Sequence, residues 1–515
     1  MSQKREQTTR QRMSACMTVA AVAALAVFPL LNDGTYSHIT RTKWYGALGL
    51  AGLCVLCALA AVLIALLRRD GRQVRWHPVC LLGVAYVAWV GVSAWLGPMG
   101  HRLNSQGQWV WWMGATRYEG LAAKLVYLAV FLSMALAPVK KRVTLGCMAA
   151  ALAIFVGIAA LQYAGENPLG LFPGGRSVRT NYEFQSTIGN IDMVSGYLSL
   201  VTPMLLVGFV LLRGPLRYGL LLAGMLGMLL TLCMEVQSGL IVLAALLLWT
   251  AGYGLCHPSR RRSCLWVLAL AALCMALRKG LQLPWLDGSE DVTLQWSGTV
   301  LRLLCVAVLL ATSAETWGRT TRFALRPAAL AALLAAAALA GCVYLACTEL
   351  PESKGGLYEL SELLHGRAQD SFGSYRLGTW RLALRMAAEH PWVGTGPNTF
   401  VYAMQEQLAQ AGLSFPETFD SAHNGYITML AENGIPALLL YVGLLGTAVF
   451  WGIRAARRQP WLWMTTLALV CYAVQDFFSF SICLVAPMFW AVLGMHMAAW
   501  NAMRNTRKTG GERQC

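Results

Sequence analysis

The sequence predicts an all-α membrane protein, a polytopic bundle of about 12–14 transmembrane helices. Its 515 residues are 57% hydrophobic and only 13% charged, with a mean hydropathy of +0.52. Soluble proteins carry roughly 25% charged residues, so this composition fits a lipid environment better than water. Disorder, fibrous repeats and a small disulfide-stapled secreted fold are excluded by the same values.

Fourteen stretches are long and apolar enough to cross a bilayer as a helix, which needs about 20 residues with every backbone group bonded internally. The first is long, lacks a small-residue cleavage site and is followed by further spans, so we expect a membrane helix and not a removed signal peptide. The stretches lie near residues 13–32, 44–67, 77–97, 120–138, 143–164, 193–212, 216–233, 237–255, 262–278, 296–313, 326–346, 434–454, 460–478 and 482–500.

The basic residues set the orientation of these spans. Lys and Arg number 41 against 24 acidic residues, which gives a net charge of +17. Most of the basic residues fall in alternate short connections, beginning with the N-terminal segment. Short cytoplasmic loops are enriched in Lys and Arg, so we expect both termini to be cytoplasmic. The positive charge is therefore a topological signal, and nucleic acid is not expected as a partner.

The cysteine pattern predicts neither a metal site nor a disulfide framework. Most of the 15 cysteines lie within apolar spans, where they serve as small hydrophobic residues. Cys54 and Cys57 form a C-x-x-C pair in mid-membrane, without a second pair at zinc spacing. We therefore expect no metal and no cofactor.

Polar residues concentrate in three outer segments, 98–119, 165–192 and 347–433. We accordingly expect an N-terminal transmembrane region of about eleven helices at 1–346. A large extracytoplasmic loop follows at 347–433, then C-terminal transmembrane helices at 434–500 and a cytoplasmic tail at 501–515.

Within the large loop, residues 374–390 have the spacing of an amphipathic helix. Trp380, Leu384 and Ala387 form one stripe along it. Arg376 lies about 140° around the helix from Arg381, toward the side that could face the membrane domain. A proline at position 391 ends the helix.

Residues 420–426, Asp-Ser-Ala-His-Asn-Gly-Tyr, open a short helix that we expect to end at Asn433-Gly434. A helix N-terminus disfavours a protonated imidazole, so His423 in the first turn would stay neutral and able to accept a proton. Asp420, three residues earlier, can cap that helix or orient the ring. A single histidine in an outer loop is more often a surface residue, but this one stands in an ordered polar cluster.

Two stretches of this loop resemble the signature of the O-antigen ligase and O-antigen polymerase superfamily. They are 394–400 (Gly-Thr-Gly-Pro-Asn-Thr-Phe) and 423–436 (His-Asn-Gly-Tyr-Ile-Thr-Met-Leu-Ala-Glu-Asn-Gly-Ile-Pro). Arg376 and Trp380 match the family's Arg-x3-Trp helix. Residues 189–192, Gly-Asn-Ile-Asp, resemble its Gly-Asn-Pro-Asn motif, and residues 117–120, Arg-Tyr-Glu-Gly, resemble an upstream element of many members.

The resemblance implies a bacterial glycosyltransferase with the C-type fold (GT-C). Such enzymes move a glycan from undecaprenyl diphosphate to an acceptor hydroxyl on the outer face of the inner membrane, without a metal. The family's roles fall on His423 as the base and on Arg376 as a cation for the diphosphate. One motif departs from the family: where many members have Ser-Arg-Gly at the start of a middle span, residues 235–240 read Glu-Val-Gln-Ser-Gly-Leu, with no arginine. Either another cation, such as Arg179 or the intramembrane Arg302, fills that role, or the donor is held differently.

The candidate site residues follow from these motifs. His423 and Arg376 are the catalytic candidates. The substrate-binding candidates are Arg176, Arg179, Asn190, Arg302, Trp380, Asp420, Asn424 and Glu432. The sequence offers no pair of carboxylates that suggests a covalent glycosyl intermediate, so we expect direct displacement with inversion.

The implied partners are a lipid-linked glycan donor, membrane lipids, and an acceptor that can be a glycan, the lipid A core or a protein. The site candidates concern the shared donor, so ligase, polymerase and protein O-oligosaccharyltransferase all remain open. A polysaccharide-related transporter is a more distant alternative, with Lys124, Arg302 and Asp476 along its pathway. No internal repeat relates the two halves of the chain, and the polar motifs cluster outside the membrane, which both argue against transport.

Overall fold

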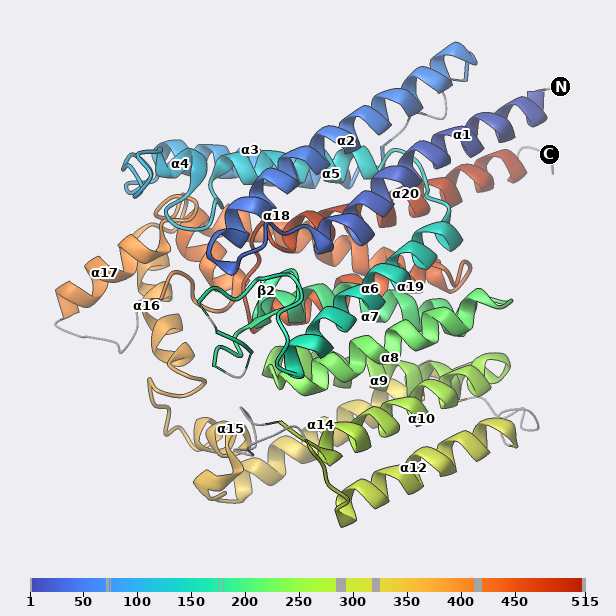
Figure 1. Cartoon of the computed structure of the whole chain (residues 1–515). Coiled ribbons are helices and arrows are strands. Elements are labelled where there is room, and N and C mark those ends of the chain that lie inside the picture. The colour runs from blue at the N-terminus through green and yellow to red at the C-terminus, as the bar shows by residue number, and fades with distance from the viewer. Residues whose placement is uncertain are drawn as a thin grey trace.

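The computed structural model of the chain describes residues 2–70, 74, 76–174, 176–178, 180–283, 293–316, 325–411 and 419–511. The described chain is mostly helical with very little strand, and its long helices lie side by side as a bundle (Figure 1). The predicted all-α membrane fold is thus confirmed.

Each of the predicted spans coincides with a helix. Within the described residues, ten helices are long and apolar enough to cross a membrane, α3, α5 and α19 are shorter apolar helices, and α20 is a further helix that coincides with the last predicted span. The helices are α1 (Ser2–Val22), α2 (Ile39–Leu67), α3 (Cys80–Leu96), α5 (Leu121–Met134), α6 (Lys141–Tyr163), α7 (Ile191–Leu211), α8 (Leu216–Met234), α9 (Gln237–Cys256), α10 (Pro258–Gly280), α12 (Gly298–Glu315), α14 (Pro327–Cys347), α18 (Gly425–Ala456), α19 (Leu462–Phe477) and α20 (Ala486–Gly511).

Helix α7 lies at the centre of the bundle. Its residues are buried from Met193 to Leu211, and it packs against α8 and α19. A helix that is apolar on every side is stable only where other helices surround it, which explains this position. By contrast, α14 has no buried residue and α12 has few, so these two peripheral helices present apolar side chains outward.

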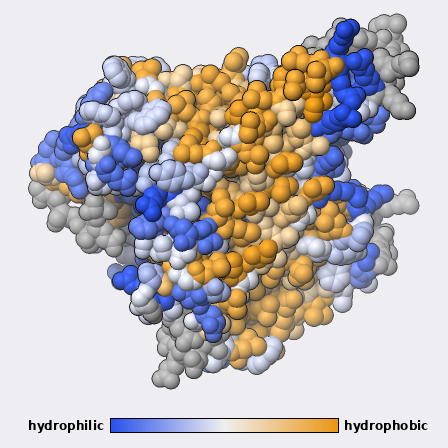
Figure 2. Space-filling model, turned by 45° about the horizontal axis from the view of Figure 1, so that its top comes forward, coloured by the Kyte–Doolittle hydropathy of each residue, from blue (hydrophilic) through white to orange (hydrophobic). Residues whose placement is uncertain are grey.

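The surface carries a broad hydrophobic band with hydrophilic residues gathered at its two ends (Figure 2). Such a band is the expected surface of a multi-pass membrane protein. Both termini lie at one end of the bundle, and the short helices of the large loop lie at the opposite end (Figure 1). These are α15 (Gly356–Leu364), α16 (Arg376–Glu389) and α17 (Phe400–Ala411), preceded by a 3-10 turn at Glu352–Lys354.

Short elements complete the end that carries the loop helices. Helix α4 (Val110–Met113) precedes α5. Strand β1 (Phe184–Gln185) pairs antiparallel with β2 (Gly189–Asn190) just before α7. A second antiparallel pair joins β3 (Leu281–Gln282) and β4 (Thr293–Leu294). Near the start of the chain, α1 continues through a π-helical turn (Ala23–Val27) and a 3-10 turn (Phe28–Leu30), and another 3-10 turn (Tyr36–His38) leads into α2.

Helix α16 forms where the amphipathic pattern predicts it, but its buried face differs from the predicted stripe. Leu382, Ala383, Met386 and Ala387 are buried, whereas Leu384 is half exposed. The reason is the packing partner: α16 contacts both α17 and α18, and its inner face turns toward them.

Helix α18 joins the predicted short helix and the twelfth span, with a break at Gly434 where the predicted helix ends. Gly434 has φ +77°, and a Cβ there would lie 2.0 Å from the carbonyl oxygen of Trp392. The loop 391–396 packs into this break and replaces the missing helical hydrogen bonds. The amides of Thr395, Gly396 and Ile435 donate to the carbonyls of Ala431 (3.0 Å), Glu432 (2.8 Å) and Pro391 (2.8 Å), respectively.

Candidate active site

His423 lies immediately before α18 and is partly exposed. The structure corrects the expectation that it occupies the first turn: Asn424 is the N-cap, and its Oδ1 accepts the amides of Tyr426 and Ile427, both at 3.0 Å. His423 itself has φ +47°, a left-handed conformation that is uncommon for a residue with a side chain. Phe480 contacts the imidazole edge-on, at 5.3 Å between ring centroids.

Trp380 of α16 fixes the backbone beside His423. Its indole Nε1 donates to the carbonyl oxygen of Ala422 at 2.8 Å, and its ring meets Phe477 edge-on. Ala422 is fully buried. Trp380 therefore positions the segment that carries His423 (residues 419–424, the histidine loop) relative to α16, the helix that begins with Arg376.

Asp420 neither caps α18 nor orients the imidazole, as the sequence had suggested it could. Its Oδ2 lies 2.5 Å from Nε of Arg117, in an ion pair between the loop before α18 and the loop before α5. The Arg117 guanidinium also lies 4.3 Å from the centre of the Phe480 ring. Phe480 thus contacts both Arg117 and His423.

Arg376, the first residue of α16, is partly buried, and among the described residues its side chain makes no ion pair or hydrogen bond. Burial lowers its pKa, and the charge of Asp192 acts in the opposite direction. A guanidinium that has lost part of its hydration without gaining a direct partner is a favourable site for an anion.

The electrostatic setting keeps His423 neutral. Burial, together with the positive charges of Arg376 and Arg117, lowers its pKa to about 4. A neutral imidazole is what the sequence predicted, but the main cause is burial together with two guanidinium groups.

Four helix N-termini bring these side chains together. Arg117 lies just before α5, Asp192 in the first turn of α7, Arg376 at the start of α16 and His423 just before α18. The positive ends of helix dipoles and their unpaired amides favour anions. Residues more than 300 positions apart in the chain therefore place two guanidinium groups, Arg117 and Arg376, near a neutral histidine.

Three other candidate residues make hydrogen bonds to the backbone that hold the helices around the site in place. Asn190 is the N-cap of α7, with Oδ1 accepting the amide of Asp192 at 3.0 Å. Asn424 caps α18, as described above. Glu432 is buried, and its Oε1 accepts the amide of Phe400 at 3.1 Å, which ties the break in α18 to the start of α17.

Neither Arg302 nor Arg176 contacts His423 in the part of the chain that the structure describes. Arg302 is exposed on the peripheral helix α12, which packs mainly against α10, and this location excludes it from the site that we propose below. Arg176 is exposed in the segment before β1. Arg179 lies outside the described residues.

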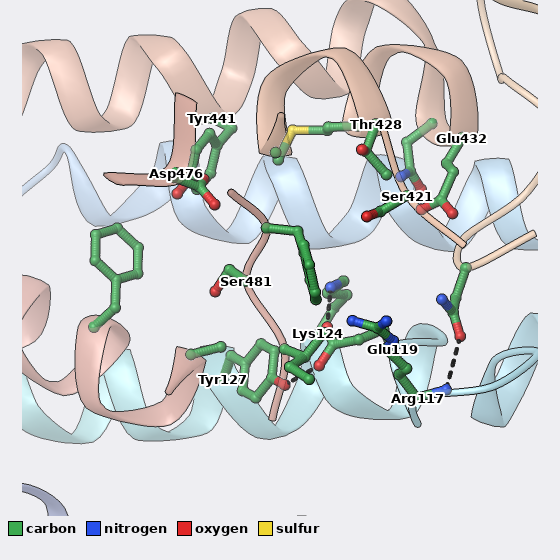
Figure 3. Close-up of a pocket in the computed structure, with 18 of the residues that line it drawn as sticks. Arg117, Glu119, Lys124, Tyr127, Ser421, Thr428, Glu432, Tyr441, Asp476 and Ser481 are labelled. Carbon is green, nitrogen blue, oxygen red and sulfur yellow. Dashed lines mark hydrogen bonds and ion pairs between the residues drawn. The ribbon is translucent and has the colours of Figure 1, made fainter. Parts of the chain in front are cut away.

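A cavity with an empty volume of about 790 Å³, part of it open to solvent, adjoins this cluster (Figure 3). Arg117, Asp420 and Phe480 line it on the side of the histidine loop. Deeper in the bundle, Glu119 of the same lining accepts from Lys124 Nζ and from the Tyr127 hydroxyl, both at 2.5 Å.

Sequence reasoning missed Arg117 and Asp192 as site residues. Both stand in motifs that it had noted, Arg-Tyr-Glu-Gly at 117–120 and Gly-Asn-Ile-Asp at 189–192. Their roles depend on the electrostatic interaction of Asp192 with Arg376 and on the ion pair of Arg117 with Asp420, which no local spacing predicts.

The comparison with protein families agrees with the motifs. The family model described as O-antigen ligase matches residues 246–442, less than half of the chain but including α16, α17 and the histidine loop. No curated protein matches the chain. Residues 246–442 of this chain are thus similar to the O-antigen ligase family, and the Arg-x3-Trp, Gly-Thr-Gly-Pro-Asn and His-Asn-Gly motifs all lie within that segment.

Proposed function

We propose that the chain is a membrane glycosyltransferase of the O-antigen ligase type, which transfers a glycan from undecaprenyl diphosphate to an acceptor hydroxyl. The observation that carries this proposal is the pairing of a neutral His423 with the unpaired cation of Arg376 at one end of the bundle. Transfer from a sugar diphosphate needs both a proton acceptor and a cation for the leaving group.

The donor diphosphate would bind to Arg376, with Arg117 beside it. Guanidinium groups bind phosphate oxygens through two parallel hydrogen bonds, and Arg376 has donors to offer. Breaking the bond between the anomeric carbon and the phosphate oxygen leaves the electron pair on the diphosphate. Fixed positive charge where that negative charge grows is often the largest single contribution to catalysis.

His423 would act as the general base. As the acceptor oxygen forms its bond to the anomeric carbon, the hydroxyl proton passes to the imidazole. The diphosphate departs from the opposite face, so the configuration inverts. Base catalysis of this kind contributes roughly 10²–10⁴-fold to the rate.

Donor binding would also make His423 a better base. The charges of Arg117 and Arg376 lower the pKa of the imidazole in the free protein. A bound diphosphate would offset both charges, so the pKa of His423 would rise when the donor is in place. The imidazole of His423 would therefore bind a proton more tightly only while the donor, with its sugar–phosphate bond, occupies the site.

The proposed site faces the outer surface of a bacterial inner membrane. Its end of the bundle lies opposite the termini, and the basic residues of the short loops predict cytoplasmic termini (Figure 1). On that surface the lipid-linked donor and the glycan, lipid A core or protein acceptor would meet. Ligase, polymerase and protein O-oligosaccharyltransferase activity all use the site described here.

Deletion of the gene, with analysis of surface polysaccharide, tests the proposal. Lipid-linked glycan with uncapped lipopolysaccharide would indicate a ligase, single-repeat products a polymerase, and an unmodified protein a protein transferase. Complementation with His423→Ala should fail at normal protein levels, whereas His390→Ala, another histidine of the large loop, should restore the product. If His423→Ala complements fully, the transferase proposal is wrong, and transport becomes the better explanation.

A further inference from the structure

The cavity beside the histidine loop is lined by a different set of polar groups from those around Arg376. It continues between α5 on one side and α18 and α19 on the other (Figure 3). Four carboxylates line it, and its two cations, Lys124 and Arg117, are already paired with Glu119 and Asp420. Carboxyl groups therefore outnumber cations in this lining, whereas Arg376 has no ion-pair partner among the described residues.

Asp476 is the carboxylate without a partner. It is 4% exposed, it lines the cavity, and its buried Oδ1 has no hydrogen-bond partner among the described residues. A buried polar atom without a partner costs free energy, and a ligand hydroxyl would remove that cost. Gly425 makes room for this group, because a Cβ there would lie 2.5 Å from Oδ1 of Asp476.

Aromatic and hydroxyl groups complete the lining. Tyr86, Tyr441 and Trp490 supply flat apolar surface, and Ser481 and Thr428 supply hydroxyls. Carboxylate and hydroxyl oxygens accept hydrogen bonds from several hydroxyls at once, while aromatic faces cover C–H groups. A sugar ring carries both kinds of group, and a phosphate would be repelled by the carboxylates.

We propose that this cavity binds an uncharged sugar residue of the acceptor, with Asp476 accepting its hydroxyl hydrogens. The proposal rests on the transferase function proposed above. It places the acceptor here because the donor diphosphate needs the unpaired guanidinium of Arg376. Phe480 forms part of the cavity wall and also contacts His423, so the cavity and the proposed base both border this ring. The acceptor is then a glycan and not a protein side chain.

The test uses the full-length enzyme in lipid nanodiscs with an undecaprenyl-diphosphate-linked donor. Two acceptor oligosaccharides are compared that differ only in the terminal residue, a hexose or the corresponding hexuronate. Asp476→Asn should raise the KM for the hexose acceptor about tenfold, since a hydrogen bond to a charged group is lost, and leave the donor KM unchanged. The same change should also weaken the preference for hexose over hexuronate, because it removes the repelling charge.

Control variants separate this role from general damage. Asp370→Asn alters an exposed aspartate of the large loop that pairs with Arg381, and both KM values should stay as in the wild type. If Asp476→Asn does not fold, Tyr441→Phe removes a cavity hydroxyl and should raise the hexose-acceptor KM several-fold.

The outcomes are distinct. Wild-type enzyme that transfers glycan to neither acceptor nor to a protein contradicts the transferase function itself. Transfer that depends on His423, with an unchanged hexose preference in the folded cavity variants, overturns only the assignment of the cavity. Transfer to protein hydroxyls but not to either oligosaccharide overturns it as well.

Discussion

Trp380 and Ala422 are joined by a hydrogen bond of 2.8 Å from the indole Nε1 to the backbone carbonyl oxygen. Ala422 precedes His423, and Trp380 follows Arg376 by one helical turn. This hydrogen bond therefore sets the position of His423, the proposed base, relative to Arg376, the proposed diphosphate-binding cation. The geometry of the site thus depends on a residue that need not touch the substrate.

Trp380→Phe removes the indole N–H and keeps an aromatic ring against Phe477. Misplacement of a catalytic group by about 1 Å can cost roughly 100-fold, so we expect kcat to fall at least about tenfold, with little change in the donor KM. Turnover of purified enzyme in nanodiscs measures this. Trp392→Phe, at a side chain that is 66% exposed, is the matched control and should keep the wild-type rate. A wild-type kcat for Trp380→Phe would refute a positioning role.

Arg376→Ala should lower kcat/KM on the order of 100-fold, since a preorganised charge at the leaving group is removed. Arg376→Lys should recover only part of this loss, because an ammonium cannot bind a phosphate through two parallel hydrogen bonds. Arg381→Lys, on the exposed face of the same helix and paired with Asp370, is the control. Equal activity of the Lys and wild-type enzymes would show that bidentate binding is not needed.

The pH dependence reports the charges around His423. Its pKa of about 4 means that the free enzyme has a neutral imidazole above that pH and loses the base as the pH falls through it. We expect kcat/KM to stay flat down to about pH 5 and kcat to fall at a higher pH, because the bound donor raises the pKa.

Arg117→Gln should move the acid limb of the kcat/KM profile to higher pH. It removes one positive charge that disfavours the imidazolium form and so raises the pKa of His423. Arg102→Gln, at an exposed arginine paired with Glu406, should leave the profile unchanged. An acid limb that does not move with Arg117→Gln would mean that the titrating group is not His423.

Gly434→Ala should destabilise the protein. The φ of +77° disfavours any side chain by about 1–2 kcal/mol, and the added methyl group would collide with the Trp392 carbonyl oxygen in addition. Thermal unfolding in detergent should show a lower Tm. Gly446→Ala, in the same helix with no atom within 4 Å of its Cβ, should keep the wild-type Tm or raise it. An unchanged Tm for Gly434→Ala would contradict the packing described at the break.

The sequence predicted the membrane helices well because their signal is local. Apolar stretches such as 193–212 define a helix by composition, and the glycine at 434 marks a break by its own conformational freedom. Contacts between distant segments gave no such signal. The Arg117–Asp420 pair joins residues about 300 positions apart, and the same limit explains why Arg302 could be considered as a substrate cation although α12 lies at the periphery.

The inward face of α16 was mispredicted for a related reason. The spacing of Trp380 and Leu384 describes one apolar stripe, but the partners of the helix, α17 and α18, select the neighbouring face with Leu382 and Met386. The periodicity of apolar residues predicts that a helix is amphipathic. Which of its residues become buried depends on the elements that pack against it.

The most direct test of the account is the turnover rate of His423→Asn, measured together with donor binding in the same nanodisc preparation and compared with His390→Asn. We predict a loss of turnover of roughly 10²–10⁴-fold with donor affinity retained, and wild-type behaviour for the control. Wild-type turnover by His423→Asn would contradict the assignment of the base and, with it, the proposed mechanism.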